Sequence, residues 1–259
     1  MDLVSRDKLD AFTSLTLKTG HGEEGKHVHR YDIKERVNVI GRKKSQGLLG
    51  FHHFTGADYG GKYVGVSKKR WTDRYLELEE NDPIVESFTL LGSLAASQLT
   101  LSETGELPAP IQPLERFVCF GYWKEGPQTL PRTRWDLFRT KNLESELLPP
   151  TRATLLPHIM RTNYICQASR SYITTNPVLP AMVESGWMIC EKENIIKPVL
   201  CLYPPAPKGI LELVKCACKG SGCGSNCSCK KNNLPCTSLC KCRHEGCTNA
   251  EKYATDELQ

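Results

Sequence analysis

Nine cysteines near the C-terminus are the residues whose type and spacing indicate chemistry most directly. They lie within the 32 residues from Cys216 to Cys247 and include three C-x-C pairs. Thiolate sulfur is a preferred ligand of Zn²⁺, which takes four ligands in a tetrahedron with sulfur at about 2.3 Å. We therefore predict a zinc-binding segment. Its candidate metal ligands are Cys216, Cys218, Cys223, Cys227, Cys229, Cys236, Cys240, Cys242 and Cys247.

The number of cysteines favours a shared cluster over separate sites. Two isolated four-ligand sites would use eight thiolates and leave one over. If three of the nine sulfurs bridge two metals and six bind one metal each, they fill the coordination positions of three tetrahedral zinc ions. The residues between the cysteines are mainly small turn formers and lysines, with almost no apolar side chain. We expect three Zn²⁺ ions to supply most of the folding free energy, on the order of 10 kcal/mol or more.

Two alternatives for this segment remain open at the level of sequence. One is a disulfide knot, which C-x-C pairs are badly spaced to form and which suits a secreted protein. The other is that His244 replaces one cysteine as a ligand, although a surface position beside Arg243 is the favoured interpretation. The remaining cysteines are scattered singly, at Cys119, Cys166, Cys190 and Cys201.

The charge of the chain is unevenly distributed. Its formal net charge is +5, and residues 215–247 contain six Lys or Arg against one Glu. Nine thiolates and three Zn²⁺ sum to about −3, so these cations partly neutralise the cluster. A basic segment suits contact with a polyanion. The candidate nucleic-acid contacts are Lys219, Lys230, Lys231, Lys241 and Arg243.

The cysteine pattern resembles the CXC domain of tesmin-like proteins and also the pre-SET three-zinc cluster. The resemblance rests on Cys216–Cys218, on residues 227–236 and on Cys240–Cys242. It implies that nine cysteines bind three zinc ions. In the CXC versions it also implies DNA contact through basic and aromatic residues near the cysteines. This chain has one copy where tesmin-like proteins have two, and Asn226 stands where those repeats place a tyrosine.

A second resemblance covers nearly the whole chain. Residues 48–59, 149–164 and 205–218 occur in an order similar to the C-terminal half of long open reading frames derived from mobile elements in animal genomes. In those proteins the upstream segment resembles a PIN-like, flap-endonuclease-type nuclease core. The resemblance implies a DNA- or chromatin-associated protein of mobile-element origin.

On that resemblance Asp58 would hold Mg²⁺, while Lys62 and residues 68–70 would face phosphate. A two-metal site needs several carboxylates around two hard cations. The resemblance implies an acidic strand before Leu15, where this sequence offers only Asp2, Asp7 and Asp10. An inert role for Asp58 in a turn is therefore favoured. We lean towards a protein that is not an enzyme. A metal-dependent nuclease, and an inactive relic or protein-interaction module with structural zinc, are the alternatives.

The elements around these residues can be predicted from apolar periodicity and turn signals. We expect strands near residues 15–19 and 27–33, short helices within 47–54 and 62–78, and a hairpin formed by 187–190 and 195–202. Longer helices are expected at 83–100, at 114–122 and after a Thr151 cap, with Leu155, Ile159 and Cys166 facing inward despite Pro157. His52 and His53 should be packing or surface residues. Residues 204–207 should be a stiff spacer and 210–214 a short helical lead.

The expected fold class is α+β, with a mostly helical N-terminal region, a remnant of a PIN-like α/β domain, followed by a small irregular zinc module. The predicted segments are a partial PIN-like remnant at 1–75, a helical region at 76–175, a hairpin and Pro-rich linker at 176–214, a CXC-type cluster at 215–248 and a tail at 249–259. No apolar run approaches the ~18 residues of a membrane span. With no signal-like opening, we expect an intracellular and, given the DNA association, nuclear protein.

Overall fold

The computed structural model describes residues 16–19, 29–57, 61–141, 143, 145–172, 174–203, 215–219, 223–232, 234–236, 240–242 and 247–249. The chain divides into two compact units, residues 1–202 and 203–259. About half of the described residues are helical, and the strands form two antiparallel pairs. None of the described helices combines the length and apolar character needed to cross a bilayer.

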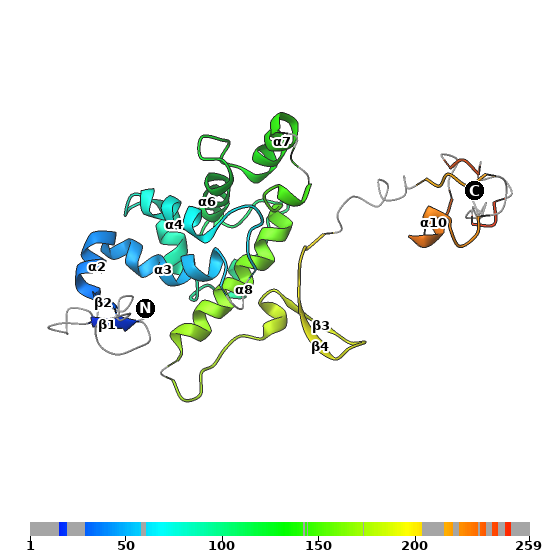
Figure 1. Cartoon of the computed structure of the whole chain (residues 1–259). Helices are drawn as coiled ribbons and strands as arrows, with labels where there is room; N and C mark the ends of the chain where they lie inside the picture. The colour runs from blue at the N-terminus through cyan, green and yellow to red at the C-terminus, as the bar shows by residue number, and fades with distance from the viewer. Residues whose placement is uncertain are drawn as a thin grey trace. The chain divides into compact units, whose positions relative to one another are not determined.

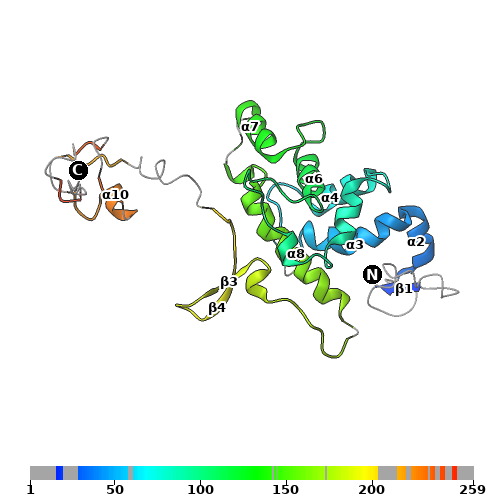
Figure 2. The ribbon, with the colours of Figure 1, turned by 180° about the vertical axis from the view of Figure 1, so that it is seen from behind.

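The first unit holds nearly all of the regular structure (Figures 1 and 2). Its α-helices are α2 (Ile33–Ile40), α3 (Arg42–Phe54), α4 (Lys68–Glu77), α5 (Pro83–Leu90), α6 (Gln112–Tyr122), α7 (Leu130–Lys141) and α8 (Arg152–Arg170). Short 3-10 helices lie at η2 (Ala96–Gln98), η3 (Ser145–Leu147) and η4 (Met182–Glu184). Its strand pairs are β1 (Thr16–Thr19) with β2 (His29–Asp32) and β3 (Trp187–Cys190) with β4 (Ile195–Pro198).

Side-chain caps fix where several of these helices begin. Asp82 accepts a hydrogen bond from the backbone N–H of Ile84, and Pro83 occupies the first turn of α5, where a missing N–H costs nothing. Thr151 caps α8 through the N–H of Thr154, at 3.2 Å, as predicted. The predicted inward residues Leu155, Ile159 and Cys166 are all buried.

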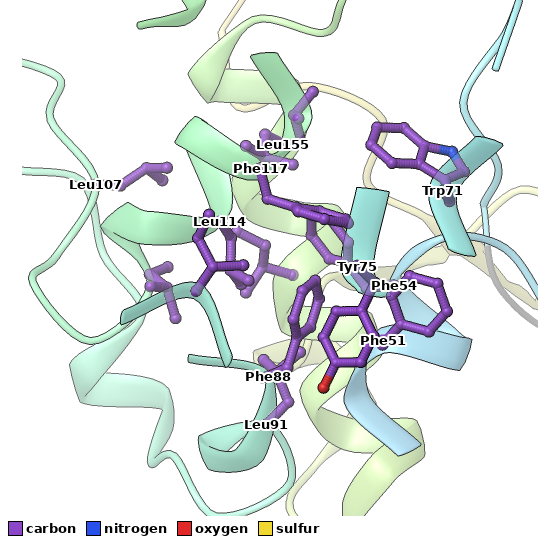
Figure 3. Packing of buried hydrophobic residues seen from close by; sticks show 14 of the residues in the cluster. Phe51, Phe54, Trp71, Tyr75, Phe88, Leu91, Leu107, Leu114, Phe117 and Leu155 are labelled. Atoms are coloured by element: carbon purple, nitrogen blue, oxygen red, sulfur yellow. The ribbon is translucent and has the colours of Figure 1, made fainter. Parts of the chain in front are cut away.

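A cluster of aromatic side chains forms the centre of the helical core (Figure 3). The rings of Phe88 and Phe117 lie edge to face with centroids 5.1 Å apart, and Phe51 stacks on Tyr75 at 4.5 Å. Such pairs add to the free energy gained by removing the rings from water. These residues come from α3, α4, α5 and α6, so residues on both sides of position 75 share one core.

Glycine allows α3 and α5 to approach closely. A Cβ atom on Gly50 would lie 2.2 Å from the carbonyl oxygen of Phe88, so only glycine fits there. α3 also packs against α8. At that contact the ring Nε2 of His158 lies 2.8 Å from the carbonyl oxygen of Phe54. Burial lowers the pKa of His158 to about 4, so the ring is neutral and Nε2–H donates to this carbonyl.

The predicted helix at 83–100 is wrong beyond Leu90. Gly92 has a φ of +96°, which an α-helix excludes, and residues 96–98 form only a 3-10 turn. The buried amide of Asn163 on α8 holds this turn, since its oxygen accepts from the N–H of Gly92 at 2.7 Å and its nitrogen donates to the carbonyl of Leu94 at 2.9 Å. A contact distant in sequence therefore ends the helix.

The other element predictions are largely confirmed. The strands at 16–19 and 29–32, the helices ending at Phe54, Glu77 and Tyr122 and the β3–β4 hairpin are present. The sequence analysis missed α2 and α7. The predicted spacer at 204–207 and helical lead at 210–214 lie outside the described residues.

Candidate metal centre

The second unit contains little regular structure, and sulfur atoms form its interior. Its one described helix, α10 (Ser228–Lys231), is a single turn. Eight of the nine clustered cysteines are buried, and Cys218 is partly exposed. The module therefore brings together all nine predicted ligands. Among the described residues, cysteine side chains form its buried cluster.

The sulfur atoms fall into three overlapping groups of four, and within each group they lie within 4.8 Å of one another. The groups are Cys216, Cys218, Cys223 and Cys227; Cys216, Cys229, Cys236 and Cys240; and Cys216, Cys223, Cys236 and Cys242. Several cysteines thus belong to more than one group. This overlap is compatible with a cluster whose metal ions share ligands.

Cys216, Cys223 and Cys236 form a nearly equilateral triangle of sulfurs. The Sγ–Sγ distances are 3.7 Å from Cys216 to Cys223, 3.8 Å from Cys216 to Cys236 and 3.7 Å from Cys223 to Cys236. A disulfide would need a sulfur separation of about 2.05 Å. All thirteen cysteines are among the described residues and none forms a disulfide, so the disulfide alternative finds no support in this geometry.

Cys247 completes the set. The backbone N–H of Asn249 lies 3.4 Å from its sulfur and lowers the pKa of Cys247. The thiols of Cys223, Cys242 and Cys236 lower that pKa too, which shows that Cys247 contacts these three. The ninth sulfur therefore lies next to two corners of the triangle.

The thiols experience different local environments. The backbone N–H of Lys230, in α10, lowers the pKa of Cys227 to about 6 by stabilising its thiolate. Burial raises the pKa of Cys229 to about 12 and also raises that of Cys236. Because metal ligation requires thiolates, a cation entering this site would displace protons from buried thiols.

The predicted nucleic-acid contacts that belong to the described residues are all on the surface of the module. Lys219, Lys230, Lys231 and Lys241 are exposed, as is Lys215. Arg243 and His244 lie outside the described residues, so neither the predicted phosphate contact nor the alternative ligand role is tested. The described lysines are therefore in contact with solvent, whereas eight of the nine clustered cysteines are buried.

Two of the residues tied to the nuclease resemblance, Lys68 and Arg70, donate hydrogen bonds within the first unit. Asp58 lies outside the described residues. The ammonium of Lys68 donates to the carbonyls of His52 and Gly56 and to Thr55 Oγ1, at 2.7–2.9 Å, and so caps the C-terminal end of α3. Arg70 donates to the carbonyl of Tyr122 at 3.0 Å. Among the described residues, cysteines alone form groups of three or more metal-ligating side chains.

His52 and His53 behave as the sequence predicted. His52 is exposed, and His53 is partly buried with its Nε2 at 3.3 Å from Ser169 Oγ. Asn249 is the functional residue that sequence analysis missed, because an asparagine after the last cysteine has no distinguishing pattern. Its side-chain Nδ2 lies 3.4 Å from the sulfur of Cys236.

The arrangement is that of a candidate metal centre for zinc or a similar thiophilic ion. Comparison with known proteins adds no family to this conclusion, because no protein-family model, no curated protein and no solved structure matches the chain.

Proposed function

We propose that residues 215–249 bind three zinc ions in one nine-thiolate cluster of CXC type, and that the basic surface of this module binds duplex DNA in chromatin. The sulfur triangle carries the proposal. Sulfurs at the corners of a tetrahedron around zinc, each 2.3 Å from the metal, are about 3.8 Å apart. The triangle has sides of 3.7–3.8 Å, which match that edge.

The overlapping groups support an assignment in which the triangle sulfurs are the bridges. Each pair of triangle sulfurs then belongs to one zinc, and each zinc takes two further cysteines. The first zinc takes Cys216, Cys223, Cys218 and Cys227. The second takes Cys216, Cys236, Cys229 and Cys240. The third takes Cys223, Cys236 and Cys242, which lie together in the third group. Its fourth ligand is Cys247, which contacts these three cysteines, in place of Cys216, whose two positions the other zinc ions use.

This assignment uses every cysteine of the module once as a terminal ligand or twice as a bridge. The terminal pair of the second zinc, Cys229 and Cys240, has sulfurs 3.6 Å apart, which again matches a tetrahedral edge. Two more close pairs, Cys216 with Cys242 at 3.7 Å and Cys227 with Cys236 at 3.9 Å, would join ligands of neighbouring metals. Such contacts are expected when three tetrahedra share corners.

DNA binding is supported by the charge around the cluster. Lys230 and Lys231 end α10, and both side chains are exposed together with Lys219 and Lys241. Four exposed ammonium groups around a small module can replace counterions on a phosphate backbone. A chromatin-bound role would place the protein in the nucleus, and the order of sequence motifs supports its descent from mobile-element proteins.

The test is the affinity of the full zinc-loaded chain for fluorescein-labelled duplex DNA, measured by anisotropy at several salt concentrations. We expect Lys230→Glu with Lys231→Glu to weaken binding and to reduce the slope of log K against log salt by about two. The control is Arg36→Glu with Lys192→Glu, which changes the net charge equally at exposed positions of the first unit. No binding at low salt, or equal weakening by both variants, would contradict the proposal.

A further inference from the structure

One helix of the first unit presents aromatic side chains to solvent. On α7, Trp135 is 56% exposed and Phe138 is 53% exposed, although large aromatic rings are usually the first side chains to be buried. The other side of the same helix packs into the unit through the buried side chains of Leu130, Thr133 and Leu137. α7 lies at the outer edge of this unit in both Figure 1 and Figure 2. The two exposed rings therefore form a face that nothing in the described chain covers.

Basic side chains border this aromatic face. Helical periodicity places Trp135 and Phe138 on one stripe, since residues three apart are neighbours on a helix surface. The same periodicity places Arg132 and Arg139 along one side of the stripe and Lys141 along the other. Lys141 lies over the ring of Trp123, with its ammonium 5.1 Å from the ring centroid. A third aromatic ring therefore adjoins the face.

The charge of this region is positive overall. Residues 121–141 contain five Lys or Arg against two Asp or Glu. One of the two acids, Asp136, is already paired with Arg132 at 2.8 Å. Among the described residues, no carboxylate pairs with Arg139 or Lys141 at ion-pair distance. The face is thus complementary to a polyanion that also offers flat apolar surfaces.

We propose that the α7 face, defined by Trp135, Phe138, Arg139 and Lys141, is a second nucleic-acid site that binds single strands. An exposed aromatic ring can stack on a base only where the base is unpaired, because duplex bases are stacked on each other. Rings one helical turn apart can each take one base, while arginine and lysine contact the phosphates between them. This site is on the first unit and does not depend on the DNA binding proposed for the cysteine module.

The experiment uses the full zinc-loaded chain and a labelled single-stranded oligothymidylate. We expect Trp135→Ala with Phe138→Ala to weaken binding roughly tenfold or more, because stacking on aromatic rings is lost. Trp135→Phe keeps a ring and should keep most of the affinity. It should also reduce the quenching of tryptophan fluorescence that the oligonucleotide causes in the wild type. Trp71 is fully buried and cannot report, so the quenching that remains would come from Trp123, beside the face.

The matched control is Ile189→Ala with Ile196→Ala, which removes exposed apolar area from the β3–β4 hairpin, where these side chains are 54% and 50% exposed. This variant should bind oligothymidylate as the wild type does. In the Lys230→Glu, Lys231→Glu background the roughly tenfold effect of the α7 substitutions should persist. If the effect persists, it supports the α7 site whether or not the cysteine module binds duplex DNA. The two proposals can therefore fail independently.

Equal affinity of the wild type and the α7 double variant for oligothymidylate would overturn the proposal. So would self-association that the double variant abolishes without any oligonucleotide binding, because a second copy of the chain would then be the occupant of the face.

Discussion

Asn249 and Cys236 make two hydrogen bonds with each other, one through the backbone and one through their side chains. The backbone N–H of Cys236 donates to the carbonyl of Asn249 at 2.6 Å, and the side-chain Nδ2 of Asn249 lies 3.4 Å from the sulfur of Cys236. The same nitrogen lies 3.0 Å from the carbonyl of Leu234. A residue after the last cysteine thus holds a triangle sulfur in place.

Replacing Asn249 by alanine should weaken zinc binding. Groups that hydrogen-bond to metal ligands orient them, and their loss costs roughly 10–100-fold in metal affinity. Competition with a chromophoric chelator measures this affinity. Asn232→Ala is the control, because Asn232 belongs to the same module and its amide donates to the carbonyl of Ser228 rather than to sulfur. Equal zinc affinity of the Asn249 variant and the wild type would refute a supporting role.

Bridging and terminal cysteines should differ in the amount of metal lost on substitution. Cys223→Ser removes a sulfur assigned to two zinc ions, whereas Cys218→Ser removes a partly exposed sulfur assigned to one. We expect the first variant to release more zinc per chain than the second. Elemental analysis after dialysis measures the content, and identical losses would contradict the assignment of Cys223 as a bridge.

Gly50→Ala should destabilise the helical unit although alanine is the better helix former by about 1 kcal/mol. The new Cβ would lie 2.2 Å from the backbone oxygen of Phe88, which cannot move without displacing α5. Overpacking of this kind costs roughly 1–3 kcal/mol. The effect is measured by urea unfolding followed by tryptophan fluorescence. A stabilised Gly50 variant would show that α3 and α5 are not in close contact.

The stability of the helical unit should fall in mild acid because of His158. Its folded pKa, about 4, lies below the ordinary value of 6.5, so the folded state binds the proton less readily than the unfolded state. The corresponding stability is present above pH 6.5 and is lost as the pH falls from there through 4. Between pH 7.5 and 5 the loss should be about 2 kcal/mol.

His158→Gln is the matching variant, since glutamine can still donate to the carbonyl of Phe54 but does not titrate. The difference in unfolding free energy between the wild type and this variant should therefore change with pH over that range. Parallel pH profiles of the two proteins would show that the ring is not kept neutral by burial.

The parts of the fold that sequence predicts are those with local signals. Thr151 caps α8 through a contact only three residues away, and the hairpin strands are separated by a short turn. The helix predicted at 83–100 failed because Leu91 and Leu94 continue the apolar period although Gly92 breaks the backbone. The contact with Asn163 that fixes this break is distant in sequence and left no local signal.

The missed helix α7 shows a second limit. Its buried residues include Thr133 and Asp136, while Trp135 and Phe138 are exposed, so its apolar residues do not mark its inward side. For the candidate site, the cysteine pattern predicted which side chains lie together, whereas the number of metal ions stays a prediction. The choice of Cys216, Cys223 and Cys236 as the shared sulfurs required the distances between them.

The central claim is that nine cysteines hold three zinc ions in one cluster, and native mass spectrometry of the full chain purified with zinc under reducing conditions tests it most directly. The account predicts a mass increase of three zinc ions per chain, which excess chelator removes. Two zinc ions per chain, or a metal-free chain whose cysteines have lost hydrogens as disulfides, would contradict it.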